Sequence, residues 1–238
     1  MTPWPALPRS LGAAGRFFYA YVFLAAVPDV RRWHRQRNIP DEVSWATLAD
    51  MGRHLAVNRR LHGEGGLDQP LWLRSHFRGA LYQLGRLQFC RSQISYEPAM
   101  LERLSVPFQH GDPVLDLHIP EQGPLTPAAC DHSLGWAPDF FSRHFSDKRY
   151  GVAICTSWLL DDQLASYLEP DSNIMRFQHR FNLLPGGGDG DEDMLRFVFR
   201  EVSPTLEELP QRTRLERAVV GHLQAGRHWK VRTGWLDL

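Results

Sequence analysis

The clearest alternation of apolar and polar positions lies in residues 114–119, which read VLDLHI. In an extended chain Leu115 and Leu117 fall on one side, and Asp116 and His118 fall on the other. This period of two predicts a half-buried strand with an apolar inner face. Its polar face carries a carboxylate beside an imidazole, a pairing that can fix the tautomer of a histidine and raise its basicity.

The segment after this strand has the composition of a loop that leads into a helix. Residues 120–126 read PEQGPLT, Thr126 is a good N-cap, and Pro127 stands where proline is tolerated, at the first helical position. Unpaired amides at such a helix start, together with the helix dipole, favour an anion. The predicted donors are the amides of Gly123, Leu125 and Thr126. An ordinary strand-to-helix connection looks the same, so both interpretations stay open at this point.

The remaining pattern predicts strands and helices in mixed order. Apolar or alternating runs predict strands at residues 80–89, 150–157, 195–202 and 228–236, with Gly85 as a possible bulge. Spacings of three and four predict helices at residues 17–28, 44–62, 127–143, 161–168 and 213–225, and they favour a helix over a strand at residues 174–181. The expected fold is therefore α/β, with one mixed domain at residues 44–238 behind a helical N-terminal arm at residues 1–43.

Composition narrows the classes of protein that fit. The formal net charge is +0, so the chain has no basic field for nucleic acid. Cys90, Cys130 and Cys155 lie far apart and form no CxxC pair. That usage is typical of a reduced cytosolic protein without structural disulfides or zinc. No metal site is predicted.

The longest apolar run, Phe17 to Pro28, is shorter than the ~20 residues that a membrane span needs. A signal peptide is the competing interpretation, because Arg9 and Arg16 precede the run. However, the PDVRRWHRQR that ends it offers no small-x-small cleavage site. We therefore expect a packed helix in a cytoplasmic protein that has no membrane partner.

His118 at the end of its strand, next to a phosphate-ready loop, suits a general base that acts beside a phosphorylated cofactor. The alternative places His118 on a solvent face with Asp116 as a surface neighbour.

Four segments carry a resemblance to a known family. They are ATLADMGRHLAVNRRLHGEGGLDQPLWLRSHFRGALYQLGRLQF, LDLHIPEQGPLTPAACD, CTSWLLDDQLASYLEPDSNI and GHLQAGRHWKVRTGWL. With the order strand, loop, helix, strand and short helix, they resemble the GNAT superfamily of acyl-CoA-dependent N-acyltransferases. More particularly, they resemble the GNAT-like C-terminal domain of bacterial acyltransferase domain-containing proteins. The resemblance covers roughly residues 45–238, and the arm resembles the end of that family's N-terminal domain.

The resemblance implies a GNAT-like fold and a CoA site. In that fold the strand–loop–helix grips the CoA pyrophosphate, here at Gly123, Leu125 and Thr126, and pantetheine lies between two splayed strands. A backbone N–H near Ile154 and Thr156 on the second splayed strand would polarise the thioester carbonyl. The loop departs from the family pattern, because it has a single glycine and an acidic residue, Glu121.

The activity implied is transfer of an acyl group from acetyl-CoA or another acyl-CoA to a small-molecule amine by direct attack. In this scheme His118 accepts the amine proton and Asp116 orients the imidazole. Tyr167 sits in the segment where GNAT enzymes often have a tyrosine that protonates the leaving thiolate, although a packing role also fits. The alternatives are a non-catalytic GNAT-like module that binds CoA or regulates a partner, and a biosynthetic enzyme with different chemistry on this fold.

Overall fold

The chain forms two compact units in a computed structural model that describes residues 9–200 and 205–238. The first unit is Met1–Gln83 and the second is Leu84–Leu238. This boundary does not coincide with the expected division after residue 43. The difference arises because the three helices that follow the arm pack with it in one helical unit.

The first unit is helical. Its elements are η1 (Arg9–Phe17), α1 (Phe18–Gln36), α2 (Asp41–Leu48), α3 (Asp50–His62) and α4 (Pro70–Phe77), and β1 (Leu81–Leu84) crosses its boundary. The Phe23 ring on α1 lies 4.4 Å from the Phe77 ring on α4, between centroids. Ala20, Leu67 and Leu73 complete this buried cluster. Apolar contacts between helices therefore hold the unit together.

The helix α1 is longer than the apolar run that predicted it. With η1 it forms a 26-residue helical stretch, Leu11–Gln36, that is long and apolar enough to cross a membrane by length and composition. Only one stripe of it is buried in the first unit, whereas Tyr21 and Leu24 on the other side are exposed. The expectation of a packed helix thus holds for one face, and the length criterion does not exclude a span. The cytoplasmic location remains a prediction.

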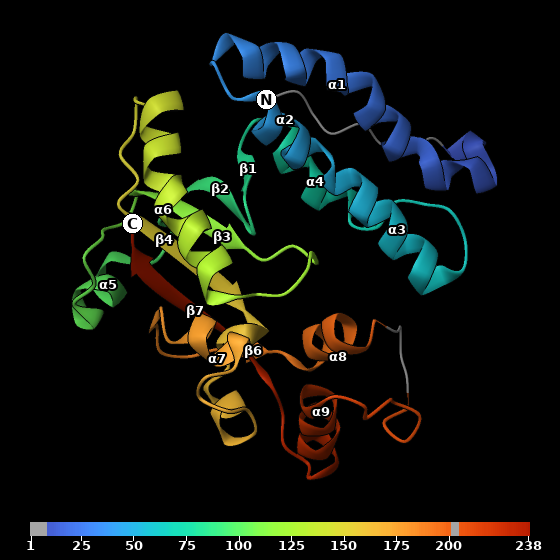
Figure 1. Ribbon diagram of the computed structural model, residues 1–238, viewed down its shortest axis with the longest axis vertical. Coiled ribbons are helices and arrows are strands. Elements are labelled where there is room, and N and C mark those ends of the chain that lie inside the picture. Colours follow the sequence, from blue (N-terminus) through green and yellow to red (C-terminus); the bar gives the residue numbers. More distant parts are fainter. Residues whose placement is uncertain (1–8, 201–204) are drawn as a thin grey trace. The chain divides into compact units, whose positions relative to one another are not determined.

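The second unit is a mixed sheet with helices (Figure 1). Its strands are β2 (Leu87–Gln93), β3 (Pro113–His118), β4 (Val152–Ser157), β5 (Asn182–Leu183), β6 (Gly188–Asp189) and β7 (Lys230–Asp237). They lie in the order β2-β3-β4-β7-β5, and β6 pairs with β7. The pair β3–β4 is parallel, and the pairs β2–β3 and β4–β7 are antiparallel. The α/β class with a helical N-terminal region is confirmed.

The helices and turns of this unit fall between the strands. They are α5 (Pro98–Leu104), α6 (Pro127–His144), η2 (Trp158–Leu160), η3 (Asp162–Ser166), α7 (Asn173–Gln178), α8 (Asp191–Phe199) and α9 (Arg214–Gln224). α6 covers the face of the sheet that Leu115 and Leu117 share. Phe141 of α6 lies 6.5 Å from Phe89 of β2, between ring centroids. Asp116 and His118 consequently face the other side, as the alternation predicted.

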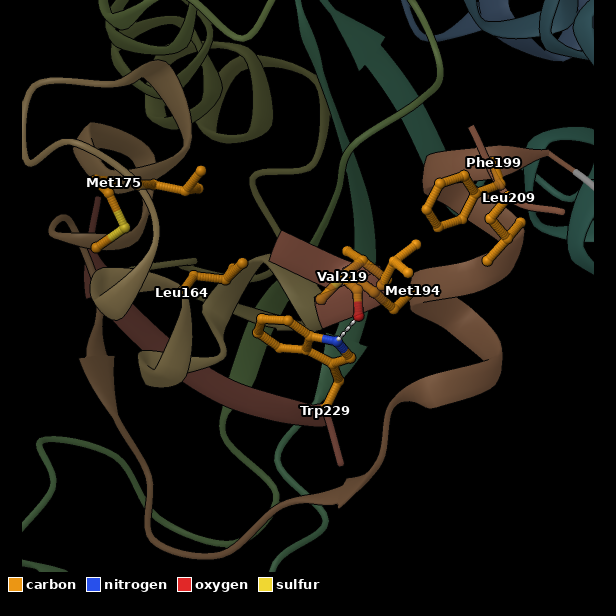
Figure 2. Close-up of a cluster of buried hydrophobic side chains, with 9 residues drawn as sticks. Leu164, Met175, Met194, Phe199, Leu209, Val219 and Trp229 are labelled. Carbon is orange, nitrogen blue, oxygen red and sulfur yellow. Dashed lines mark hydrogen bonds between the residues drawn. The ribbon is translucent and has the colours of Figure 1, made fainter. Parts of the chain in front are cut away.

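A second buried cluster joins α8, α9 and the start of β7. Figure 2 shows Trp229 lying among Leu164, Met194 and Val219, with its indole N–H donating to the Val219 carbonyl at 3.5 Å. The α9 helix begins with the predicted capping box, in which Thr213 and Glu216 exchange hydrogen bonds. This cluster holds the elements that follow β4 against the end of the sheet.

Two predicted elements are wrong. Residues 195–202 were expected to form a strand, but the described part of this stretch lies in α8, whose first turn is acidic (Asp191, Glu192 and Asp193). Negative charge there complements the helix dipole, and Met194 and Phe199 are buried in the cluster, so packing overrides the strand propensity of FVF. Residues 80–89 form two strands with a turn, because Gly85 adopts a left-handed φ of 64°.

Truncation of Phe23 tests whether the buried stripe of α1 stabilises the first unit. Phe23 is 1% exposed, so Phe23→Ala should lower the free energy of unfolding by about 3–5 kcal/mol. Tyr21→Ala is the matched control in the same helix, because Tyr21 is 69% exposed and its loss should cost little. Urea unfolding followed by circular dichroism measures both, and equal stabilities for the two variants would contradict the packing assigned to α1.

Candidate active site

The two central strands of the second unit stop pairing before they end. The register between β3 and β4 consists of Leu115 opposite Ala153 and Asp116 opposite Ile154. Both strands then continue toward their C-terminal ends, where β4 stays paired with β7 as far as Ser157. The edges of β3 and β4 that face each other are therefore open beyond Ile154. In sheets with parallel strands, ligands bind at this end of the strands.

A cavity of about 230 Å³ extends from this end of the strands toward the start of β3. Its walls come from β3, β4, the end of β2 and the segment that follows β2. Four of the predicted site residues line it: Asp116, His118, Ile154 and Thr156. Ile154 also belongs to a buried apolar cluster with Ile94 and Val114, both of which line the cavity. The cavity therefore combines an apolar wall with a small number of polar groups, the usual composition of a ligand site.

The Asp116 carboxyl group is half-buried and hydrogen-bonded. Burial raises its pKa, and a hydrogen bond from the Ser92 hydroxyl opposes this effect by stabilising the carboxylate. Ser92 is on β2, opposite Val114 in the register, so it reaches Asp116 diagonally across the strands. Sequence reasoning missed Ser92, because nothing in the local pattern indicates which β2 residue faces the acid.

His118 is half-buried at the end of β3, opposite the buried residue Gln88 of β2. It shares the cavity with Asp116. The imidazole therefore lies where a proton acceptor would reach a ligand held between β3 and β4. Thr156 closes the β4 side of the cavity, and its hydroxyl is 2.9 Å from the hydroxyl of Thr233 on β7.

The loop between β3 and α6 has the features of an anion site. Thr126 caps α6 as predicted, because its side chain accepts a hydrogen bond from the Ala129 amide at 3.4 Å. Across residues 9–200 and 205–238, the amides of Gly123, Leu125 and Thr126 donate to no protein acceptor. Gly123 is exposed and left-handed, with a φ of 59°. Three unpaired donors thus stand at the start of an 18-residue helix, whose dipole adds positive potential.

Two arginines alter the charge of this loop. Glu121, which would repel a phosphate, forms an ion pair with Arg200 at 2.9 Å. Arg86 lies on the turn after β1, and its guanidinium donates to the carbonyls of Pro120, Gly123 and Pro124. Neither arginine was predicted as a site residue, although a lone charge in the apolar stretch LGRLQF is a local signal for Arg86.

Tyr167 lies apart from the residues that line the cavity. Its hydroxyl is 2.8 Å from Nδ1 of His222, a buried residue that is stacked on Trp229. This arrangement places Tyr167 against the cluster of Figure 2 and supports the packing role in place of the general-acid role.

The thiol of Cys155, on the opposite face of β4, is buried. Burial raises its pKa to about 12, and the nearby Asp116 carboxylate adds to the effect. Both effects favour the neutral thiol, so Cys155 is poorly suited to carry an acyl group. Among the described residues, no group of three His, Cys, Asp or Glu side chains is placed to hold a metal ion.

Family models match both parts of the chain. Residues 81–236 match a GNAT-like C-terminal domain, and residues 1–79 match an N-acyltransferase N-terminal domain. The two matches meet beside the boundary between the compact units. No curated protein matches the chain.

Several solved structures are similar over nearly the whole chain. An acyltransferase in complex with decanoyl-CoA is 46% identical, with a TM-score of 0.89 over 100% of this chain and 71% of that one. An acyltransferase in complex with decanoyl-CoA and teicoplanin is 48% identical, with a TM-score of 0.87 over 98% of this chain and 70% of that one. An acyltransferase in complex with CoA and 10C-teicoplanin is 46% identical, with a TM-score of 0.87 and the same coverage.

The environment of Asp116 predicts opposite effects of one substitution on stability and on activity. The pKa of Asp116 is raised in the folded protein, so its contribution to stability is greatest at low pH and is lost as the pH rises through the folded-state pKa. Asp116→Asn should therefore stabilise the protein at pH 7, on the order of 1 kcal/mol, while reducing turnover. Asp139→Asn on the exposed side of α6 is the control. Urea unfolding at pH 4 and pH 7 measures the stability of both variants. A greater destabilisation by Asp116→Asn at pH 7 than at pH 4 would contradict this assignment.

Proposed function

Because the chain belongs to the acyltransferases that carry a GNAT-like C-terminal domain, we propose that it transfers a medium-length acyl group from CoA to an amine of a glycopeptide-like small molecule. The chain is a GNAT-type acyltransferase, and acyl-CoA is its co-substrate. The observation that carries the proposal is the cavity between β3 and β4, which joins His118 and Asp116 to an apolar wall. The loop that follows His118 in the chain carries three amides that have no protein acceptor among the described residues.

In the proposed reaction the neutral amine attacks the thioester carbonyl carbon directly. His118 accepts the proton that the nitrogen loses, and the Asp116 carboxylate stabilises the imidazolium that forms. The C–N bond forms as the C–S bond breaks, and CoA leaves as a thiolate. Because an ordinary thiol has a pKa of ~8.5, this leaving group needs little help from an acid, consistent with the position of Tyr167 outside the cavity. A backbone N–H of the open β4 edge near Ile154 and Thr156 would polarise the carbonyl.

The apolar wall favours an acyl chain longer than acetyl. Ile94, Val114 and Ile154 belong to both the cavity and the buried cluster beside α5. Burial of each methylene in such surroundings contributes roughly 0.8 kcal/mol. The similar acyltransferases were solved with octanoyl-CoA and with decanoyl-CoA, donors of the chain length expected here. The teicoplanin complexes of these proteins point to an amine of a glycopeptide as acceptor.

The pyrophosphate of CoA is assigned to the loop before α6. The free amides of Gly123, Leu125 and Thr126 supply donors, and the ion pair between Arg200 and Glu121 offsets the acidic charge of the loop. The atypical sequence of this loop favours the alternative of a non-catalytic module. With the acidic charge paired and the amides free, the loop keeps the properties that phosphate binding needs.

The direct test is an assay of the purified protein with decanoyl-CoA and a teicoplanin-type glycopeptide that has a free amine. Mass spectrometry should find the N-decanoyl product, and a thiol reagent should detect one CoA released for each acyl group transferred. Decanoyl-CoA should give a higher kcat/KM than acetyl-CoA, because only the longer chain reaches the apolar wall. Absence of product with every chain length from acetyl to decanoyl would refute the proposed reaction.

Removal of the proposed base should slow the chemical step. His118→Ala should lower kcat by about 10²–10⁴-fold, with the affinity for acyl-CoA nearly intact. In the wild type kcat should fall at low pH, because protonated His118 cannot accept a proton, and the variant should lose this acidic limb. His132→Ala, at an exposed position on α6, is the control and should behave as wild type. Wild-type turnover in His118→Ala would make this histidine structural.

A pair of substitutions at Gly123 separates charge from backbone strain. The space around the position is open, so a side chain fits, but its left-handed φ of 59° strains any residue with a Cβ. Asp and Asn have nearly the same shape, and both tolerate this conformation better than most residues. Gly123→Asp should weaken CoA binding about 10-fold or more relative to Gly123→Asn, because only Asp repels the pyrophosphate. Equal dissociation constants in calorimetric titrations would place the phosphates elsewhere.

A further inference from the structure

Arg86 donates hydrogen bonds to three carbonyl groups of the loop that precedes α6. Its Nη1 donates to the Pro120 carbonyl at 2.9 Å, its Nε to the Pro124 carbonyl at 3.2 Å, and its Nη2 to the Gly123 carbonyl at 3.3 Å. One planar guanidinium thus spans the loop from its start to its middle. A lysine cannot reproduce these contacts, because its three donors radiate from a single atom.

The turn that carries Arg86 is fixed against α6. The Ser133 hydroxyl accepts hydrogen bonds from the amides of Arg86 at 2.8 Å and Leu87 at 3.3 Å, and it donates to the Ala129 carbonyl at 3.0 Å. Ser133 is fully buried. Gly85 must remain a glycine for this contact, since a Cβ there would lie 2.9 Å from the Ser133 Oγ. Ser133 therefore fixes the backbone of the turn from which the Arg86 guanidinium extends.

These contacts separate the donors of the loop from its acceptors. The carbonyls of Pro120, Gly123 and Pro124 are engaged by the guanidinium, while the amides of Gly123, Leu125 and Thr126 remain free in the part of the chain that the structure describes. An anion at these amides would otherwise be repelled by neighbouring carbonyl oxygens that were free to rotate toward it. Positive charge from Arg86 also reaches the first turn of α6, where it lowers the pKa of Cys130 against the larger effect of burial.

We propose that Arg86 is a positioning residue for the pyrophosphate of the acyl-CoA donor, because it holds the loop in the arrangement that presents the three amides. The proposal rests on the proposed function. It explains how a loop with one glycine and no basic residue of its own can serve a phosphate: the cation comes from the turn between β1 and β2, distant in sequence, and acts through the backbone.

The test compares two donors in wild type, Arg86→Ala and Arg86→Lys. Decanoyl-CoA carries the pyrophosphate, and S-decanoyl-pantetheine carries the same reactive thioester without any phosphate. With decanoyl-CoA, both variants should raise KM roughly 10- to 100-fold, the size expected for loss of hydrogen bonds from a charged group, with kcat at saturation nearly unchanged. With S-decanoyl-pantetheine, kcat/KM should be the same in all three proteins, because no phosphate contact is lost.

Arg91→Ala is the matched control. Arg91 is also an arginine of the β2 segment with a defined role, donating to the Tyr150 hydroxyl at 3.0 Å and covering the Phe145 ring. Whatever stability this variant loses, it keeps the contacts of the loop before α6. The ratio of its kcat/KM values for the two donors should therefore equal that of the wild type. Arg86→Lys guards against misfolding, since it keeps the charge and most of the side-chain volume.

A calorimetric titration with CoA gives a second readout that needs no turnover. The dissociation constant should rise by the same factor as KM in the Arg86 variants. Unchanged CoA binding in Arg86→Ala, or an equal loss of kcat/KM with both donors, overturns the proposal and leaves Arg86 as a general support of the sheet. Failure of the wild type to acylate any amine, with CoA binding still weakened in Arg86→Ala, would instead reject the proposed reaction and keep the role of Arg86.

Discussion

The short register between β3 and β4 is the constraint on which the candidate site depends. Each strand is held along its outer edge, β3 by β2 and β4 by β7, while the strands pair with each other only as far as Asp116 and Ile154. The outer pairs fix the strand ends, so the edges beyond this point stay open and bound a cavity. The alternation of β3 then directs Asp116 and His118 to the cavity, and Leu115 and Leu117 to the face that α6 covers. The end of this pairing and the alternation of β3 together place His118 and Thr156 at one end of the cavity.

The electrostatic environment of the loop before α6 depends on residues from outside its own sequence. A phosphate needs free N–H groups and no nearby acceptor or negative charge. Arg86 binds the loop carbonyls, and Arg200 pairs with Glu121, so the unfavourable groups are occupied. In the cavity, by contrast, an acidic group stays partly buried. Asp116 remains half-buried with one hydroxyl partner, which costs stability and keeps a carboxylate beside His118. Residues that weaken a fold in this way are expected at catalytic sites.

The elements that could be predicted are those whose signal is local. The strand at Pro113–His118, the Thr126 cap and the capping box of α9 follow from residues within a few positions of each other. The failures have non-local causes. The stretch LRFVF has strand propensity, but α8 forms because Met194 and Phe199 are buried against α9 and Trp229. The break after residue 43 looked like a boundary, whereas contacts made by α2 to α4 with α1 place it near residue 83.

By itself the sequence determined the family resemblance, the alternation that pairs Asp116 with His118, and the helix start that follows them. Periodicity and capping act over one or two turns of chain, so a linear pattern contains them in full. Only the tertiary structure decided that β3 and β4 stop pairing, that Ser92 reaches Asp116, and that Arg86 holds a loop more than thirty positions away. It also placed the Tyr167 hydroxyl 2.8 Å from Nδ1 of His222. These contacts join segments far apart in sequence, and which of them meet depends on how whole elements pack, a property that no local pattern records.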